Sequence, residues 1–189
     1  MSKKNQKGAD KNVTATEEVM EFAAGDLEAL CQATEEAIVE GQGFSWLKPP
    51  PPGTLEAYWR GVLLIPERTL FVARLNGHIV GAVQLVRPPR NNEQGAFSAE
   101  MATFFIAPWA RGYGLARSLL RDAELKARQE GFTTLEVNVR ADRKAAIALA
   151  EASGFVKWAT KERYARVNGG YLPGYYYVKY LDQTELPEV

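Results

Sequence analysis

The sequence predicts a single-domain protein of the α+β class, and three observations lead to this prediction. Its 189 residues suit one domain with a full hydrophobic core, since domains usually contain about 100 to 200 residues. An Asn76-Gly77 pair separates two apolar runs, and Asn-Gly readily adopts the positive φ angles of a hairpin turn. Further along, a short apolar run leads into a glycine-containing loop and then into residues with helical spacing.

The N-terminal third predicts a tail followed by two helices. Lysine-rich, polar residues without periodicity open the chain, so we assign residues 1–15 to a disordered tail and residues 16–189 to the domain. We expect Asp26 to cap a first helix that ends near Gly41. After a proline-rich loop, Thr54 is expected to cap a second helix.

The remaining residues alternate predicted strands with predicted helices. Apolar runs bounded by turn residues predict strands at residues 70–75, 78–86, 99–106, 135–139 and 175–181. Leucines and alanines at helical spacing predict helices at residues 115–131 and 146–155. Gly131 suits the left-handed residue that closes the first of these helices.

Charge and cysteine content argue against several classes of protein. Acidic and basic side chains balance to a formal net charge of zero, so bulk electrostatics favours neither nucleic acid nor a membrane surface as a partner. No apolar run approaches the roughly 20 residues that span a bilayer, and the N-terminus lacks the apolar core of a secretion signal. The single cysteine, Cys31, cannot form an internal disulfide, and no Cys/His cluster has metal-ligand spacing. We therefore expect a cytoplasmic protein without a metal site.

Residues 111–116, Arg-Gly-Tyr-Gly-Leu-Ala, carry the strongest chemical signal. They follow a predicted strand and begin a predicted helix, where the first backbone N–H groups lack intrahelical partners and the helix dipole is positive. The two glycines let the backbone approach an anion closely, and Arg111 adds a charged guanidinium fork. These properties predict a phosphate-binding loop, with a plain helix-starting turn as the alternative.

The same loop resembles the acyl-CoA pyrophosphate loop of the GNAT superfamily of N-acetyltransferases. Arg111-x-x-Gly114-x-Ala116 matches the family motif Gln/Arg-x-x-Gly-x-Gly/Ala, and the predicted helix at 146–155 ends in Gly-Phe, as the short helix of the family does. The resemblance covers residues 70–181. It implies a mixed, mostly antiparallel twisted sheet flanked by helices, and acetyl-CoA as the cofactor that leaves as CoA. The resemblance implies that the pyrophosphate is bound by Arg111, Gly112, Tyr113, Gly114, Leu115 and Ala116. It also implies that the pantetheine arm is bound by the backbone of Phe104, Phe105 and Ile106.

Acetyl transfer to an amine requires a proton acceptor, because an alkyl ammonium ion has a pKa near about 10.4. Glu100 is our candidate for this catalytic base, since its carboxylate interrupts the apolar strand that leads into the loop. An ion pair or a solvent-facing position at the start of a strand is the alternative explanation for Glu100.

The proton donor of the family is missing from its usual position. Many members place a tyrosine in the short helix, where it protonates the departing thiolate, and this chain has Ala150 there. Arg143 replaces the asparagine that is common seven residues earlier. A tyrosine from the C-terminal segment is an alternative donor, although sheet packing is the commoner role of such residues. These tyrosines are Tyr164, Tyr175, Tyr176 and Tyr177.

The family builds its acceptor pocket from the first helices, their connecting loop and the terminal strands. Those segments supply Trp46, Tyr58 and Tyr176 here, and aromatic walls suit a flat or cationic amine. Packing of the core beneath the proline-rich loop is the alternative role. The resemblance thus predicts an enzyme that transfers an acetyl group to a primary amine of a small molecule or peptide by direct attack in a ternary complex. The alternative is a non-catalytic acyl-CoA-binding sensor or interaction module, and the sequence leaves open whether the chain forms a homodimer.

Overall fold

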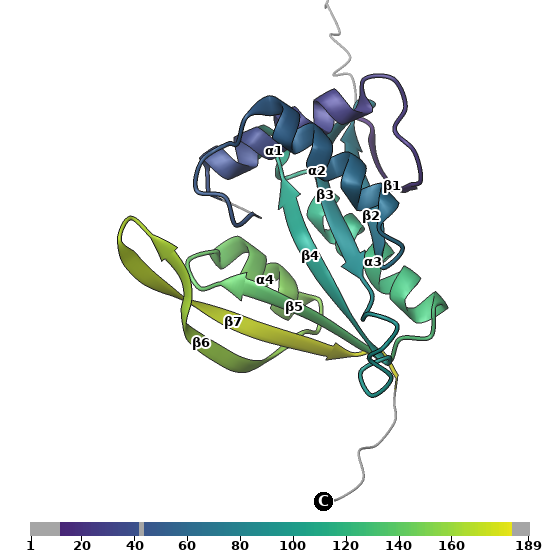
Figure 1. Ribbon diagram of the computed structural model, residues 1–189, viewed down its shortest axis with the longest axis vertical. Coiled ribbons are helices and arrows are strands. Elements are labelled where there is room, and N and C mark those ends of the chain that lie inside the picture. Colours follow the sequence, from purple (N-terminus) through teal and green to yellow (C-terminus); the bar gives the residue numbers. More distant parts are fainter. Residues whose placement is uncertain (1–11, 42–43, 183–189) are drawn as a thin grey trace, which may run out of the picture.

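The computed structural model describes residues 12–41 and 44–182 of the chain. These residues form a seven-stranded sheet with the strand order β1-β2-β3-β4-β5-β7-β6 (Figure 1). The strands are β1 (Thr14–Val19), β2 (Arg68–Leu75), β3 (His78–Val86), β4 (Ser98–Ile106), β5 (Thr134–Arg140), β6 (Val156–Val167) and β7 (Gly170–Tyr180). The helices are α1 (Asp26–Val39), α2 (Pro52–Leu64), α3 (Leu115–Gln129), α4 (Lys144–Ala152) and the short 3-10 helix η1 (Pro108–Ala110). The predicted α+β fold is confirmed.

Helices cover both faces of the sheet half that contains β2 and β3. Helix α1 packs mainly on β3 and α2 on β2, while α3 packs on β1, β2 and β3 from the opposite face (Figure 1). Strands β2 and β3 are therefore buried along nearly their whole length, as strands covered on two faces should be. All strand pairs are antiparallel except β4 with β5, so the expectation of a mixed, mostly antiparallel sheet is confirmed.

Glycine-dependent turns form where the sequence predicts them. In the β2–β3 hairpin, Asn76 and Gly77 have φ angles of 52° and 86°, which fit a type I′ turn. Gly41 follows α1 with a φ of 72°, and Gly131 follows α3 with a φ of 85°, so both helices end in left-handed glycines.

Both predicted N-caps are wrong. Asp26 lies inside α1, whose N-cap is Gly25, because its carboxylate instead binds the guanidinium of Arg74 at 2.7 Å. Thr54 lies inside α2, which begins earlier, at Pro52, since proline has no N–H to leave unpaired and its fixed φ suits the first helical turn.

Strand β1 was not predicted. Most of the proposed tail, residues 1–11, lies outside the described residues, whereas Thr14 and Ala15 already belong to this strand. Residues 14–19 are mostly exposed, with only Val19 buried, so their sequence carries no apolar run. Antiparallel pairing with β2 creates the strand, and this pairing is a long-range contact that local patterns do not report.

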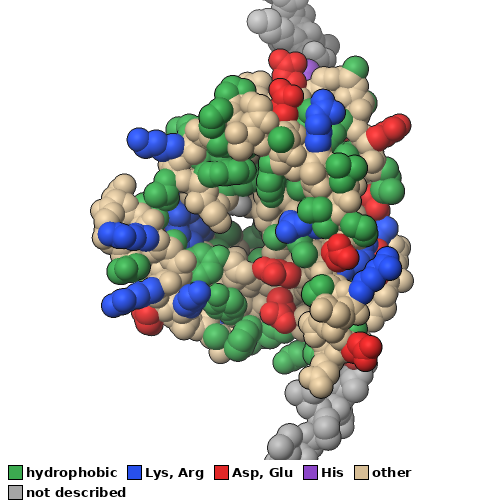
Figure 2. Space-filling model, viewed as in Figure 1, with side chains coloured by type: hydrophobic (Ala, Val, Ile, Leu, Met, Phe, Trp, Pro, Cys, Tyr) green, Lys and Arg blue, Asp and Glu red, His purple; other side chains and the backbone are tan. Residues whose placement is uncertain are grey.

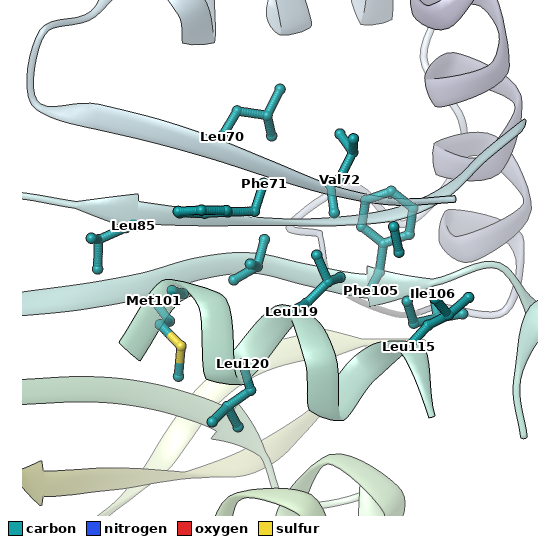
Figure 3. Packing of buried hydrophobic residues seen from close by; sticks show 14 of the residues in the cluster. Leu70, Phe71, Val72, Leu85, Met101, Phe105, Ile106, Leu115, Leu119 and Leu120 are labelled. Atoms are coloured by element: carbon teal, nitrogen blue, oxygen red, sulfur yellow. The ribbon is translucent and has the colours of Figure 1, made fainter. Parts of the chain in front are cut away.

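The hydrophobic core lies on both faces of the sheet, and Figure 3 shows the part of it between α3 and the strands. Leu119 and Leu120 of α3 point toward the strands, and Met101 of β4 points toward the helix. All three side chains are buried. Because neighbouring residues of a strand face opposite sides, the side chain of Glu100 must lie on the other face of β4, away from α3.

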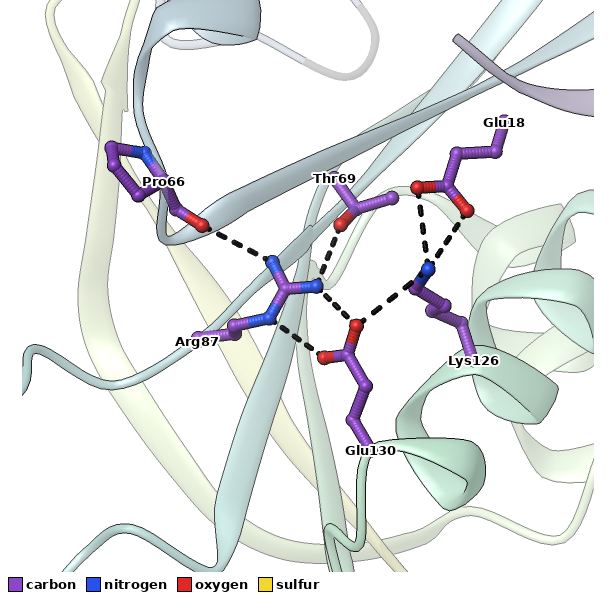
Figure 4. Close-up of polar contacts among 6 residues, drawn as sticks. All are labelled: Glu18, Pro66, Thr69, Arg87, Lys126 and Glu130. Atoms are coloured by element: carbon purple, nitrogen blue, oxygen red, sulfur yellow. Dashed lines mark hydrogen bonds and ion pairs between the residues drawn. The ribbon is translucent and has the colours of Figure 1, made fainter. Parts of the chain in front are cut away.

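Ion pairs secure the C-terminal end of α3 to β1 and to Arg87, the residue that follows β3 (Figure 4). Arg87 Nε donates to Glu130 Oε2 at 2.7 Å, and Arg87 Nη2 donates to Thr69 Oγ1 at 2.8 Å. Lys126 Nζ lies 2.9 Å from Glu18 Oε2 and 3.7 Å from Glu130 Oε1. Several charges that share partners form a network, which contributes more than isolated surface pairs do.

We expect Asp26→Asn to lower the free energy of unfolding by about 2 kcal/mol at neutral pH, the usual worth of a hydrogen bond between charged groups. The Arg74 hydrogen bond lowers the pKa of Asp26 below its ordinary value of 3.8. A depressed folded-state pKa stabilises the protein above the unfolded pKa and stops doing so as the pH falls through the folded value. The difference between wild type and variant in urea unfolding should therefore shrink below about pH 4.

Glu28→Gln is the control, because Glu28 is also acidic and lies in the first turn of α1 but is exposed. Equal losses for the two variants would mean that the helix dipole, and not the Arg74 pair, explains the effect of Asp26.

Candidate active site

The candidate active site lies where strands β4 and β5 separate. Their parallel pairing runs only from Ser98↔Thr134 to Met101↔Val137, while β4 stays paired with β3 and β5 with β7. The two halves of the sheet diverge from this point (Figure 1), and a hollow lies between them (Figure 2). In the described part of the chain, the β5-facing edge of residues 102–106 has no strand partner, so an extended ligand arm could pair with it.

A bulge in β4 lies within this free edge. The register with β3 shifts between Ala82 and Gln84, and Thr103 has a φ of 51°, which is rare for a β-branched residue. The Tyr58 hydroxyl of α2 lies 3.2 Å from Thr103 Oγ1 and accepts a hydrogen bond of 2.8 Å from Gln84 Nε2. Arg68 donates to Gln84 Oε1 at 2.5 Å. Backbone strain of this kind persists where the surroundings enforce it, and it clusters at ligand sites.

The predicted phosphate-binding loop connects β4 with α3 through η1. Gly112 and Gly114 have φ angles of 87° and 78°, and Gly114 is the N-cap of α3. A Cβ on either glycine would meet no atom within 4 Å, so conformation and not crowding demands glycine here. No described side chain caps the helix, which leaves its first N–H groups available to an anion. The geometry fits a pyrophosphate site.

Arg111, the predicted phosphate ligand, is engaged with the end of α1 in this structure. Its Nη2 lies 2.6 Å from Glu40 Oε2 and 3.4 Å from the carbonyl oxygen of Ile106. The guanidinium and the Glu40 carboxylate are each about two-fifths exposed, so their attraction is screened by water. A phosphate that bound Arg111 would therefore compete with a weak, solvent-exposed ion pair.

Glu100 lies on β4 and faces the cleft. Asn138 of β5 donates a hydrogen bond of 2.8 Å from Nδ2 to Glu100 Oε1. Although the residue is exposed overall, partial desolvation of its carboxylate raises the pKa of Glu100 above its usual value. The hydrogen bond from Asn138 opposes this shift, and the charge of Glu136 adds to it. A carboxylate with a raised pKa is a stronger base than an ordinary glutamate.

Glu136 is a second carboxylate at the same level of the cleft. It is the partner of Glu100 in the parallel register of β4 and β5, and its Oε1 accepts a hydrogen bond of 2.9 Å from Ser98 Oγ. Acidic side chains border the hollow between the two halves of the sheet (Figure 2). The sequence alone did not single out Glu136, because its position opposite Glu100 depends on strand register.

The C-terminal tyrosines divide between the two faces of the sheet. Tyr177 is buried, and its hydroxyl donates to Glu151 Oε1 of α4 at 3.0 Å. Burial, with the Glu151 hydrogen bond adding to it, raises the pKa of Tyr177 to about 12. Tyr176 is the register partner of Asn138 and therefore faces the cleft, where its ring centroid lies 6.2 Å from that of Tyr164. The Tyr164 hydroxyl bonds Asn138 Oδ1.

The family position for a catalytic tyrosine holds a buried alanine. Ala150 is 4% exposed, and its carbonyl oxygen accepts hydrogen bonds from the backbone of Ser153 and Phe155. Arg143 precedes α4 and donates from Nη1 to the carbonyl oxygen of Glu40 at 3.3 Å. Neither residue supplies a proton donor to the cleft.

The predicted acceptor residues lie on both halves of the molecule. The rings of Trp46 and Tyr58 meet edge to face at 5.4 Å, whereas Tyr176 contacts Trp158 and Tyr164 on the β6–β7 half. Trp158 is 61% exposed and was not predicted. The Tyr58 hydroxyl already holds the β4 bulge, so this residue has a structural role and offers an acceptor only its ring.

Within residues 12–41 and 44–182, no group of three or more His, Cys, Asp or Glu side chains is arranged to hold a metal ion. Over the same residues, no helix is both long and apolar enough to cross a membrane.

Comparison with known proteins identifies the family. Residues 32–155 match the model of the acetyltransferase (GNAT) family. An uncharacterized N-acetyltransferase from the hisH-hisA intergenic region of Azospirillum brasilense is 49% identical over 124 residues, which cover 66% of this chain and 74% of that protein. The N-alpha-acetyltransferase RimI of Mycobacterium tuberculosis is 34% identical over 133 residues, which cover 70% of this chain and 78% of RimI.

Solved structures agree on the fold. A GNAT superfamily phosphinothricin acetyltransferase from Sinorhizobium meliloti, in complex with acetyl-CoA, superposes with a TM-score of 0.74 at 19% identity and covers 93% of this chain and 94% of its own. The chain therefore belongs to the GNAT family of acetyltransferases, and the prediction of an acyl-CoA-dependent acetyltransferase is confirmed.

We expect Arg111→Glu to weaken the binding of CoA by about tenfold or more, because the cation predicted to bind the pyrophosphate becomes an anion. Calorimetric titration measures the change. Arg121→Glu is the control: it alters the charge equally, on the helix α3 that follows the loop, at a side chain that is 73% exposed. If both variants bind CoA as the wild type does, Arg111 is not a pyrophosphate ligand.

Proposed function

We propose that this protein transfers an acetyl group from acetyl-CoA to a primary amine of a small molecule or peptide, by direct attack in a ternary complex. One observation carries the proposal: the cleft between β4 and β5 joins an uncapped helix N-terminus to a carboxylate with a raised pKa. Anion binding and proton removal are the two tasks that N-acetylation from a CoA thioester requires.

Acetyl-CoA supplies an acetyl thioester whose thiolate is a good leaving group. Gly112 and Gly114 let the start of α3 approach the pyrophosphate, and Arg111 contributes its guanidinium. The unpaired β4 edge, residues 104–106, pairs with the amides of the pantetheine arm. Tyr113, Leu115 and Ala116 complete the loop, with buried Leu115 anchoring it to the core.

Glu100 accepts the proton of the incoming amine, directly or through a water molecule. Its carboxylate faces the cleft at the level where β4 and β5 separate. A raised pKa makes this carboxylate a stronger base. Glu136 is held by Ser98 and keeps the cleft negative, which attracts the ammonium form of an acceptor.

The acceptor lies among the aromatic rings that border the cleft. Trp46 and the ring of Tyr58 provide one wall, and Tyr176 with Trp158 provides another. Aromatic faces beside two carboxylates suit a cationic amine. The similarity to RimI, an N-alpha-acetyltransferase, supports the terminal amine of a peptide as one such acceptor. A cytoplasmic location remains a prediction.

A non-catalytic acyl-CoA sensor is the second candidate, and Ala150 favours it, because the usual proton donor is absent. Calorimetric titration with acetyl-CoA, followed by thiol release across amines and peptides, separates the two. Binding with thiol release supports the enzyme. Binding without release of thiol for any acceptor supports the sensor, and a failure to bind contradicts both.

We expect Glu100→Gln to lower the rate of acetylation at neutral pH and to recover part of it as the pH rises. At higher pH more of the amine is already deprotonated, so the lost base matters less. The measurement is a profile of kcat/KM against pH with the best acceptor.

Glu93→Gln, a change of the same kind in an exposed loop, should leave the profile unchanged. If Glu100→Gln also leaves it unchanged, Glu100 is not the base. Glu136→Gln then becomes the decisive variant, since Glu136 is the other carboxylate at this level of the cleft.

A further inference from the structure

We propose that Asn138 and Tyr164 are positioning residues that hold the carboxylate of Glu100 toward the point where β4 and β5 separate. The inference rests on the proposed function for its kinetic consequence, but the arrangement itself belongs to the free protein. Three residues from three strands form it: Glu100 of β4, Asn138 of β5 and Tyr164 of β6.

Hydrogen-bond chemistry fixes which group donates and which accepts in each of the two hydrogen bonds that join these residues. An ionised carboxylate only accepts hydrogen bonds, so the Asn138 amide must present its NH₂ group to Glu100, as it does at 2.8 Å. The amide oxygen then faces Tyr164, whose hydroxyl must donate. The carboxylate thereby selects the orientation of the Asn138 side chain, and the Tyr164 hydroxyl anchors the amide in that orientation by donating to its oxygen.

Two backbone features bring Tyr164 to this position. The register of β6 with β7 shifts between Lys161 and Ala165, and such bulges commonly redirect a side chain beside an active site. Gly174 of β7 lies beneath the tyrosine ring, where a Cβ would come within 2.2 Å of Tyr164 Cγ. The φ angle of Gly174 lies outside the left-handed range, so the ring, and not the backbone conformation, requires glycine there.

Charged and titratable groups from the neighbouring strands surround the three hydrogen-bonded residues Glu100, Asn138 and Tyr164. Glu136 of β5 and Arg68 of β2 act on Glu100 with opposite signs. Tyr176 of β7 and Arg140 of β5 face Tyr164. The uncharged Asn138 can donate to Glu100 without adding charge to this group, which already holds a second carboxylate.

The first test follows the Glu100 carboxyl by NMR titration in the free protein, with Glu100→Gln used to assign its signal. The Asn138 bond stabilises the charged form, so its loss in Asn138→Ala should raise the pKa of Glu100 by about half a unit to one unit. Tyr164→Phe should raise it in the same direction by less, because the amide remains but is free to rotate.

Gly174→Ala provides an independent test, since it keeps the tyrosine hydroxyl but displaces its ring. We expect it to reproduce the effect of Tyr164→Phe. Gly170→Ala is the matched control, because the nearest atom to a Cβ there lies 3.8 Å away. Tyr180→Phe is the control for the tyrosine, since Tyr180 is 61% exposed.

Kinetics add a second readout. In Asn138→Ala and Tyr164→Phe, the acidic limb of the pH profile should move to higher pH together with the pKa of Glu100. The value of kcat should fall, by about tenfold in Asn138→Ala, while KM for acetyl-CoA stays unchanged. An unmoved Glu100 pKa in folded Asn138→Ala and Tyr164→Phe overturns the inference, whatever the activity. A shifted pKa in a protein that acetylates no amine upholds the arrangement and contradicts the proposed function instead.

Discussion

The site depends on one constraint, which is that β4 and β5 pair over only four register positions. Each strand remains bound on its other side, β4 to β3 and β5 to β7. The divergence therefore leaves the β5-facing edge of residues 102–106 without a strand partner among the described residues, and the sheet stays folded. Unpaired backbone N–H and C=O groups are costly when they are buried away from water, so a ligand with amide groups of its own is the natural occupant of this edge.

A set of hydrogen-bonded polar side chains holds β4 in the position where it separates from β5. The bulge at Thr103 is braced by Tyr58 of α2, and Tyr58 is in turn bound by Gln84 of β3. Gln84 is fully buried, and Arg68 satisfies its amide oxygen. None of the described buried side-chain polar atoms lacks a hydrogen-bond partner. Buried polar groups that are fully satisfied favour a single arrangement, so the cleft is built into the fold before any ligand arrives.

The sequence predicted those parts of the site whose structure is decided by a few neighbouring residues. Gly131 occupies the left-handed position expected of it, and Gly112 and Gly114 also have positive φ angles in the predicted loop, because a turn at a helix end is decided by a few neighbouring residues. Asn138 and Tyr164 were not predicted as partners of Glu100, since their meeting depends on strand register and on a bulge in β6. The caps assigned to Asp26 and Thr54 failed for a related reason: a distant arginine and a neighbouring proline run outweighed a local propensity.

The tyrosines of the cleft region bear on how the thiolate departs. Near the cleft, the hydroxyl of Tyr58 is committed to Gln84 and Thr103, and that of Tyr164 to Asn138. Tyr177 lies on the other face of the sheet, where its hydroxyl bonds Glu151. If Tyr164 gave up its proton, it would lose the contact that orients Asn138 toward Glu100. A thiol has an ordinary pKa near about 8.5, so a CoA thiolate can depart near neutral pH without a strong acid. In the proposed mechanism, the hydrogen bonds around Glu100 therefore serve the step with the larger proton-transfer problem, at the ammonium group of the acceptor.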